Sequence, residues 1–112
     1  MNFSGQHVVI TGGSTGIGRA TAEIIAAAGG KVTLIARRPE KLAEAAGAIG
    51  HAAFTISCDV GDKQRLLAAL DAATDHHGKI DGLFLNAAAE GTYGLTSDYT
   101  DEAFETALRI NV

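Results

Sequence analysis

Four short apolar runs alternate with longer segments rich in alanine and charged residues along this chain. The apolar runs are rich in β-branched side chains and lie at residues 7–11, 31–36, 52–57 and 80–85. Runs of this length without polar alternation predict strands that are buried on both faces, as in a parallel sheet covered by helices. The other segments favour helices at 17–28, 39–48, about 62–76 and 100–112.

Helix ends and helix faces support these assignments. Gly29 and Gly30 follow the first helix, and glycine readily adopts the left-handed conformation that ends helices. Pro39 suits the first turn of the second helix, and Thr100 can cap the fourth. The first helix has one face composed of Ile17, Ala20, Ile24 and Ala28. The third helix has a predicted buried stripe composed of Leu66, Leu67 and Leu70.

Strands and helices alternate along the whole sequence, which predicts a Rossmann-type, three-layer α/β/α fold around a parallel sheet. Right-handed crossovers place the four strands in the order 3-2-1-4. The first and fourth strands then lie side by side, and the crevice at their carboxyl ends is where such sheets bind ligands. We expect residues 1–112 to form a single domain, because the chain is too short for more.

A glycine-rich turn joins the first strand to the first helix. It reads Thr11-Gly12-Gly13-Ser14-Thr15-Gly16-Ile17-Gly18. Glycines let the backbone approach a pyrophosphate, and the free N–H groups and dipole of the helix face the negative charge. The turn therefore predicts a dinucleotide site. A plain connecting turn is the alternative, but it requires fewer glycines than this one has.

A phosphate-binding loop of nucleotide hydrolases is a second alternative for this turn. The gap from Gly13 to Gly18 has the required length. Arg19 and Ala20, however, stand where that loop needs a lysine for the phosphates and a hydroxyl for Mg²⁺. We therefore exclude it.

The glycine spacing, with threonine in front and isoleucine between the last two glycines, resembles that of the short-chain dehydrogenase/reductase family. The resemblance implies an oxidoreductase that interconverts an alcohol and a ketone with a nicotinamide dinucleotide. It also implies that Ile17 lies near the nicotinamide. The pyrophosphate side of the cofactor would be bound by Gly12, Ser14, Thr15, Gly16, Ile17 and Gly18.

The end of the second predicted strand bears on which nucleotide binds. NAD-specific sites place a carboxylate there, about 20 residues past the glycines, but this chain has Ala36, Arg37 and Arg38. A carboxylate repels a 2′-phosphate, whereas guanidinium groups attract it and can bind it through two hydrogen bonds. We therefore predict NADP(H) rather than NAD(H). The alternative is a pair of solvated arginines ahead of a helix, and Thr15 stands where many NADP-preferring members carry a basic residue.

The resemblance extends to the ends of the third and fourth strands. It implies that Asp59, followed by Val60, accepts a hydrogen bond from the adenine amino group, although a polar residue before a Gly61 turn would look the same. The family usually has Asn-Asn-Ala-Gly at its fourth strand, and this chain has Leu85-Asn86-Ala87-Ala88. The residues that would lie around the ribose are Asn86, Ala87 and Ala88.

Only one member of the family's catalytic set is present in these residues. Asn111 matches the catalytic asparagine, but Tyr93 and Tyr99 are not followed by a lysine four residues on, so there is no Tyr-x-x-x-Lys pair. We therefore interpret the chain as a truncated member that holds the cofactor-binding half and is inactive alone. A stand-alone nucleotide-binding or assembly module without catalysis is the alternative.

Truncation also predicts self-association. Strand 80–85 would form an open apolar edge, and the helix at 100–112 would leave apolar surface uncovered. We expect a homo-oligomer through both segments.

Composition and charge bear on the ligands and the cellular compartment of the protein. The 112 residues carry a formal net charge of −4, which gives no basic surface for nucleic acid. The apolar runs are far shorter than the ~20 residues that cross a membrane, and the N-terminus has no signal-peptide pattern. Cys58 is the single cysteine and cannot form an internal disulfide, which predicts a reducing cytoplasm.

The four histidines do not indicate a metal site. His76 and His77 are adjacent, and adjacent helical residues point about 100° apart. Both precede Gly78 at a predicted helix end, where positive charge is favourable. His7 and His51 stand at strand starts, and we expect both to be exposed.

Overall fold

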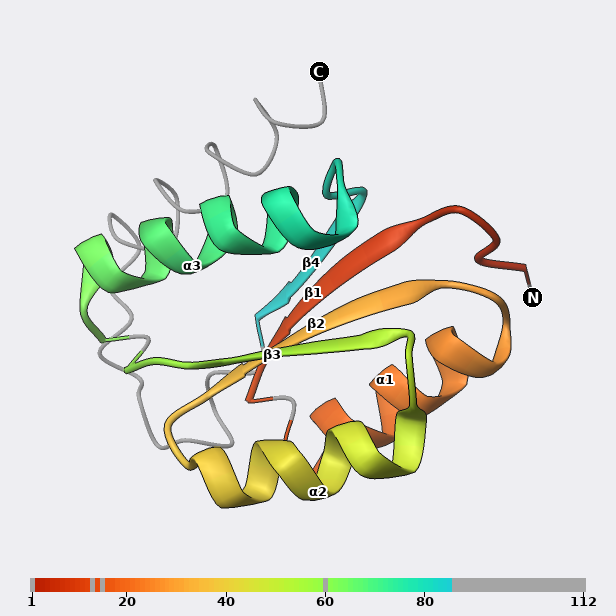
Figure 1. Ribbon diagram of the computed structural model, residues 1–112, viewed down its shortest axis with the longest axis horizontal. Helices are drawn as coiled ribbons and strands as arrows, with labels where there is room; N and C mark the ends of the chain where they lie inside the picture. The colour runs from red at the N-terminus through yellow and green to blue at the C-terminus, as the bar shows by residue number, and fades with distance from the viewer. Residues whose placement is uncertain (1, 13, 15, 60, 86–112) are drawn as a thin grey trace.

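A parallel four-stranded sheet forms the centre of the protein. The computed structural model describes residues 2–12, 14, 16–59 and 61–85. The strands are β1 (His7–Thr11), β2 (Lys31–Ala36), β3 (Ala53–Ser57) and β4 (Gly82–Leu85). Their order is β3-β2-β1-β4, and every neighbouring pair is parallel (Figure 1). This order confirms the sequence-based prediction.

Helices cover both faces of the sheet. Helices α1 (Gly16–Ala27) and α2 (Pro39–Ile49) lie on one face, and α3 (Lys63–His77) lies on the other (Figure 1). Each face has its own hydrophobic core, one containing Ile25 and Leu42 and the other Leu66 and Leu70. The three-layer Rossmann-type fold is therefore confirmed. The helix predicted at 100–112 lies outside the described residues.

The inner strands are more deeply buried than the outer ones. Every residue of β1 is buried, as is every residue of β2 after Lys31. The first four residues of β3 are only half-buried, because β3 lies at the edge of the sheet and has a neighbour on one side. Burial on both faces thus holds for β1 and β2, but not for β3, nor for residues 82–84 of β4, which are also half-buried.

Helix α1 packs through a different face from the one that its isoleucines suggest. Its buried residues are Gly18, Ala22 and Ile25, whereas Ile17 is 71% exposed and Ile24 is 59% exposed. Small residues at 18 and 22 let the helix backbone approach the sheet closely. The Ile17–Ile24 face is consequently turned away from the core.

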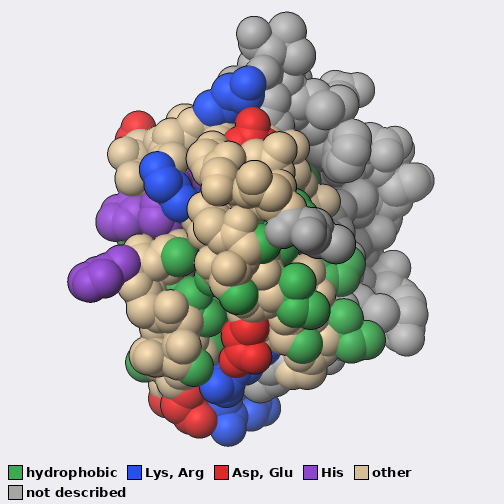
Figure 2. Space-filling model, turned by 90° about the vertical axis from the view of Figure 1, so that its right-hand side faces the viewer, with side chains coloured by type: hydrophobic (Ala, Val, Ile, Leu, Met, Phe, Trp, Pro, Cys, Tyr) green, Lys and Arg blue, Asp and Glu red, His purple; other side chains and the backbone are tan. Residues whose placement is uncertain are grey.

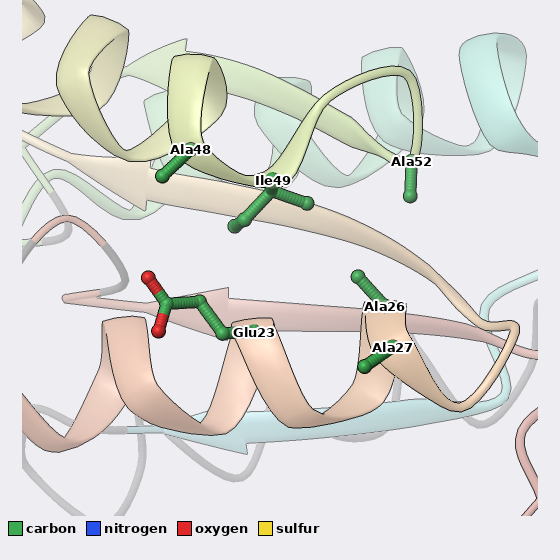
Figure 3. A pocket seen from close by; sticks show the side chains of 6 residues that line it. All are labelled: Glu23, Ala26, Ala27, Ala48, Ile49 and Ala52. Carbon is green, nitrogen blue, oxygen red and sulfur yellow. The ribbon is translucent and has the colours of Figure 1, made fainter.

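Helices α1 and α2 meet across a shallow groove lined mainly by small side chains. From α1 the groove receives Glu23, Ala26 and Ala27, and from α2 and the turn after it Ala48, Ile49 and Ala52 (Figure 3). At 100° per residue, Ala26 lies about 160–180° around α1 from Ile24 and Ile17, and Glu23 lies about 100–120° from them. Neither exposed isoleucine lines the groove.

The end of α1 requires its two glycines for different reasons. Gly29 has a φ of +93°, and its amide donates to the carbonyl of Ala26 at 3.0 Å. At Gly30 the constraint is space, because an added Cβ would lie 2.7 Å from Ile25 Cγ2 and 2.9 Å from Phe3 Cβ. The predicted glycine end of this helix is confirmed.

The expectation that His7 is exposed is wrong. His7 is only 1% exposed, and its ring lies between β2 and the end of α3 rather than in solvent. His51 is exposed as expected. None of the helices in the described part of the chain is long and apolar enough to cross a membrane.

Candidate functional site

The ends of three strands come together at one edge of the sheet. Thr11, the last residue of β1, lies opposite Ile35 of β2 and Leu85 of β4. Ala36, the last residue of β2, lies opposite Ser57 of β3. The segments that follow these strands therefore lie side by side at the carboxyl edge, which is where open parallel sheets bind ligands.

The glycine-rich turn crosses this edge from β1 to α1. Gly12 has a φ of +67° and Gly16 a φ of +61°, a region that other residues rarely adopt. The amide of Gly12 donates to the carbonyl of Ile35 at 2.7 Å, which ties the turn to β2. Ser14 is 6% exposed, so it forms part of the buried floor of the turn. At Gly12 and Gly16 the backbone thus adopts a conformation that glycine makes possible.

The N-terminus of α1 is suited to an anion. The helix begins at Gly16 and has no acidic residue in its first turn. A Cβ added at Gly16 would meet no protein atom within 4 Å, so the space beside this glycine is open. The first amides of a helix have no partner within the helix and carry its positive dipole end. The geometry fits a phosphate group.

Two arginines follow β2 at the same edge. Ala36 is buried, and Arg37 and Arg38 are both exposed. The Ser57 hydroxyl donates to the carbonyl of Arg37 at 3.1 Å, which fixes the backbone there. Residues 36–38 contain no carboxylate, so the electrostatics at this strand end favour a negatively charged group.

Asp59 follows β3 and already takes part in a turn. Its Oδ1 accepts a hydrogen bond from the amide of Gly61 at 2.8 Å, and its side chain is exposed. This turn is the alternative that the sequence left open for Asp59. A carboxylate has lone pairs for further donors, so the turn does not prevent a second hydrogen bond.

Cys58 lies beside these residues but has an unreactive environment. It is buried, and its amide donates to the carbonyl of Ala36 at 2.8 Å. Burial raises the pKa of the Cys58 thiol, and the nearby carboxylates of Asp59 and Asp62 raise it further. A thiol that stays protonated is a poor nucleophile. Cys58 is therefore a core residue.

Several predicted site residues lie outside the part of the chain that the structure describes. They are Thr15, Val60, Asn86, Ala87, Ala88 and Asn111. Among the described residues, no group of three or more histidine, cysteine, aspartate or glutamate side chains is arranged to hold a metal ion.

Two groups that shape this edge were not predicted from the sequence. The carbonyl of Ile35 accepts the hydrogen bond from the amide of Gly12. No sequence signal marks a backbone acceptor of this kind. Ser57 could have been noticed as a hydroxyl in the last position of a strand, directly before the segment that carries Asp59. Both groups position backbone rather than ligand.

Comparisons with known proteins agree on one family. The short chain dehydrogenase family model matches residues 6–112. Levodione reductase of Leifsonia aquatica is 36% identical over 115 residues, covering 98% of this chain and 43% of that protein. Short-chain dehydrogenase reductase 5 of Arabidopsis thaliana is 34% identical over 111 residues, with the same two coverages of 98% and 43%. The chain thus spans less than half the length of these relatives.

Solved structures show the same fold with either nicotinamide cofactor. The 3-ketoacyl-(acyl-carrier-protein) reductase from Brucella melitensis, complexed with NADH, has a TM-score of 0.70 at 34% identity, over 71% of this chain and 33% of that one. The C-domain of a bacterial malonyl-CoA reductase, with NADP, has a TM-score of 0.69 at 37% identity, over 72% of this chain and 14% of that one. With its strand order and glycine turn, the chain belongs to the short-chain dehydrogenase/reductase family.

Proposed function

We propose that this chain is the NADP(H)-binding portion of a short-chain dehydrogenase/reductase. The parent reaction is hydride transfer between the nicotinamide and an alcohol/ketone pair. The observation that carries the proposal is the pair Arg37 and Arg38 at the end of β2, at the same edge as the glycine turn.

The glycine turn and the start of α1 bind the pyrophosphate in this proposal. The positive φ angles at Gly12 and Gly16 and the open space beside Gly16 support it. Ile17 is 71% exposed near the start of α1, which leaves it free to contact the nicotinamide. The full set for the pyrophosphate side is Gly12, Ser14, Thr15, Gly16, Ile17 and Gly18.

The arginines distinguish the two cofactors. NADP carries a 2′-phosphate on the adenosine ribose, and a guanidinium binds phosphate through charge-assisted hydrogen bonds. NAD has a 2′-hydroxyl at that position, for which such sites use a carboxylate, and none follows Ala36. One similar solved structure contains NADH and another contains NADP. The choice of NADP for this chain therefore rests on its own arginines.

The remaining cofactor contacts follow from the family resemblance. Asp59, with Val60 beside it, would accept from the adenine amino group with an oxygen that the Gly61 turn leaves available. Asn86, Ala87 and Ala88 would lie around the ribose. Asn111 is the one catalytic residue of the family's set in these 112 residues, and alone it supports no turnover.

Self-association is part of the proposal. In the described part of the chain β4 pairs only with β1, and its other edge has unpaired backbone groups that favour pairing with a further strand. Ile24 adds exposed apolar surface on α1. We propose homo-oligomers through strand 80–85 and helix 100–112.

A binding or assembly module without catalysis is the second candidate function, and the surfaces available for self-association favour it.

The proposed compartment is the cytoplasm. Cys58 is free and buried, and a free thiol is compatible with reducing conditions.

The direct test is a calorimetric titration of the chain with NADP⁺ and, separately, with NAD⁺. Tighter binding of NADP⁺ supports the proposal. Equal or tighter binding of NAD⁺ defeats the cofactor assignment.

A further inference from the structure

Three histidines gather at the end of the sheet opposite the glycine turn. His7 is the first residue of β1, and His76 and His77 are the last two residues of α3. The ring centroids of His7 and His77 lie 5.1 Å apart, and those of His76 and His77 lie 4.6 Å apart. Phe54 of β3 stacks on His76 at 4.1 Å. Histidine side chains line one side of the face in Figure 2.

The hydrogen bonds of His7 determine where its ring proton lies. Nδ1 is 3.0 Å from the carbonyl of Gly78, which can only accept, so Nδ1 carries the proton. Nε2, 2.7 Å from the Thr33 hydroxyl, then accepts from it. Both His7 and Thr33 are fully buried. The site thus fits a neutral imidazole with one donor and one acceptor.

His7 also holds the segment between α3 and β4 against β1. Its amide donates to Asp81 Oδ2 at 2.9 Å, and the amide of Asp81 donates back to the carbonyl of His7 at 2.7 Å. Together with the ring contact to Gly78, three hydrogen bonds join His7 to residues 78–81. This segment leads directly into β4, so these bonds help to position β4 beside β1.

His77 is the member of the cluster least able to accept a proton. Its Nε2 is buried and has no hydrogen-bond partner among the described residues. Burial lowers the pKa of His77 to about 4, the neighbouring His7, His76 and Lys31 add to the effect, and a backbone hydrogen bond with Ala52 offsets only part of it. A proton on this nitrogen would be a buried charge without an acceptor, next to the ring of His7, and such a charge destabilises the closed arrangement.

Other charged groups around the cluster do not remove this conflict. Burial has the largest effect on the pKa of His7 and lowers it overall; the hydrogen bond with Gly78 and the charge of Asp81 raise it, and Lys31 of β2 lowers it. Asp81 is already engaged, because Oδ2 accepts from the amide of His7 and Oδ1 lies 3.9 Å from Lys79 Nζ. From β3 the nearest ring is that of Phe54, which carries no charge.

We propose that His7 and His77 form a pH-sensitive latch. The latch holds residues 78–81 against β1 while both rings are neutral, and protonation of His77 in mild acid releases them. It lies at the other end of the sheet from the cofactor site and does not depend on which nucleotide binds.

Amide hydrogen exchange of the unliganded chain between pH 7.5 and pH 5 tests the latch. We expect protection of the His7 and Asp81 amides, corrected for the intrinsic exchange rate, to fall about tenfold as the open form gains protons. The amide of Cys58, which bonds to Ala36 at the far end of the sheet, should lose less protection than these two amides. Flat protection at His7 and Asp81, or an equal loss at Cys58, would overturn the proposal.

Two variants separate His77 from a general effect of acid. His77→Phe retains an aromatic ring and removes the titrating group, so protection at Asp81 should become independent of pH. His51→Gln is the matched control, because His51 is exposed in the turn before β3, and it should behave as the parent chain does. An unchanged loss of protection in His77→Phe would overturn the proposal.

If His77→Phe does not fold, the ring nitrogen chemical shifts of His7 in the parent chain test the latch instead. The ring nitrogen shifts of His7 should report the neutral, Nδ1-protonated form at pH 7.5. They should change over the same pH range in which the Asp81 amide loses protection. A charged His7 ring at pH 7.5, or ring titration without loss of protection, would contradict the latch.

Discussion

The amide of Gly12 donates a 2.7 Å hydrogen bond to the carbonyl of Ile35. This bond joins the glycine turn after β1 to the strand that ends two residues before Arg38. The two parts of the proposed NADP(H) site are therefore held by adjacent strands of one rigid sheet. A change in either part is expected to affect cofactor binding more than it affects the fold.

Gly16→Ala tests the backbone requirement of the turn. The φ of +61° at Gly16 is unfavourable for alanine, and we expect a loss of about 1 kcal/mol in the free energy of unfolding. Gly47→Ala is the control, because Gly47 lies inside α2 with no atom within 4 Å of an added Cβ. It should raise stability by about 0.5–1 kcal/mol. Equal effects of the two changes in denaturant unfolding would contradict this account of the turn.

Replacing the arginines tests the cofactor assignment. The double change Arg37→Ala and Arg38→Ala should weaken NADP⁺ binding by about 1.5–3 kcal/mol and leave NAD⁺ binding nearly unchanged, because only NADP⁺ has the 2′-phosphate. Lys31→Ala removes a positive charge from the opposite end of β2 and serves as the control. A similar loss for both nucleotides would place the arginines outside the 2′-phosphate site.

The histidine cluster predicts that stability falls in acid. The pKa of His77 is about 4 in the folded chain and near its ordinary value of 6.5 when unfolded, so the unfolded chain binds more protons below pH 6.5. Stability should therefore be lost as the pH falls from about 6.5 towards 4. His77 is only partly buried, so we expect a loss of about 1–2 kcal/mol by pH 5. Thermal unfolding of the chain and of His77→Phe measures this loss, which should be smaller in the variant.

Sedimentation velocity tests self-association. The edge of β4 that pairs with no described strand, together with the exposed Ile24, predicts that the average mass rises with protein concentration. Ile24→Lys should shift the distribution towards the monomer, whereas Ala43→Lys, on an exposed position of α2, should not. A monomer at every concentration would rule out association through these surfaces.

The sequence was sufficient for the order of the strands because of a simple physical regularity. Each apolar run is separated from the next by a helix, and right-handed crossovers then leave few arrangements of the sheet. The glycine turn was recognisable because Gly12 and Gly16 require a backbone conformation that other residues avoid.

Side-chain environment was harder to predict. His7 was expected in solvent because histidine is polar, but Gly78 and Thr33, 71 and 26 residues away in sequence, satisfy both ring nitrogens. The packing face of α1 was also missed. Its rotation depends on small Gly18 and Ala22 lying against the sheet, while the larger Ile17 and Ile24 attract attention in the sequence.

Calorimetric titration of the chain with NADP⁺ and NAD⁺ decides which cofactor the site binds. We expect NADP⁺ to bind at least tenfold more tightly, a difference of about 1.4 kcal/mol. NAD⁺ binding as tightly as NADP⁺ would contradict this expectation, and so would the absence of binding by either nucleotide.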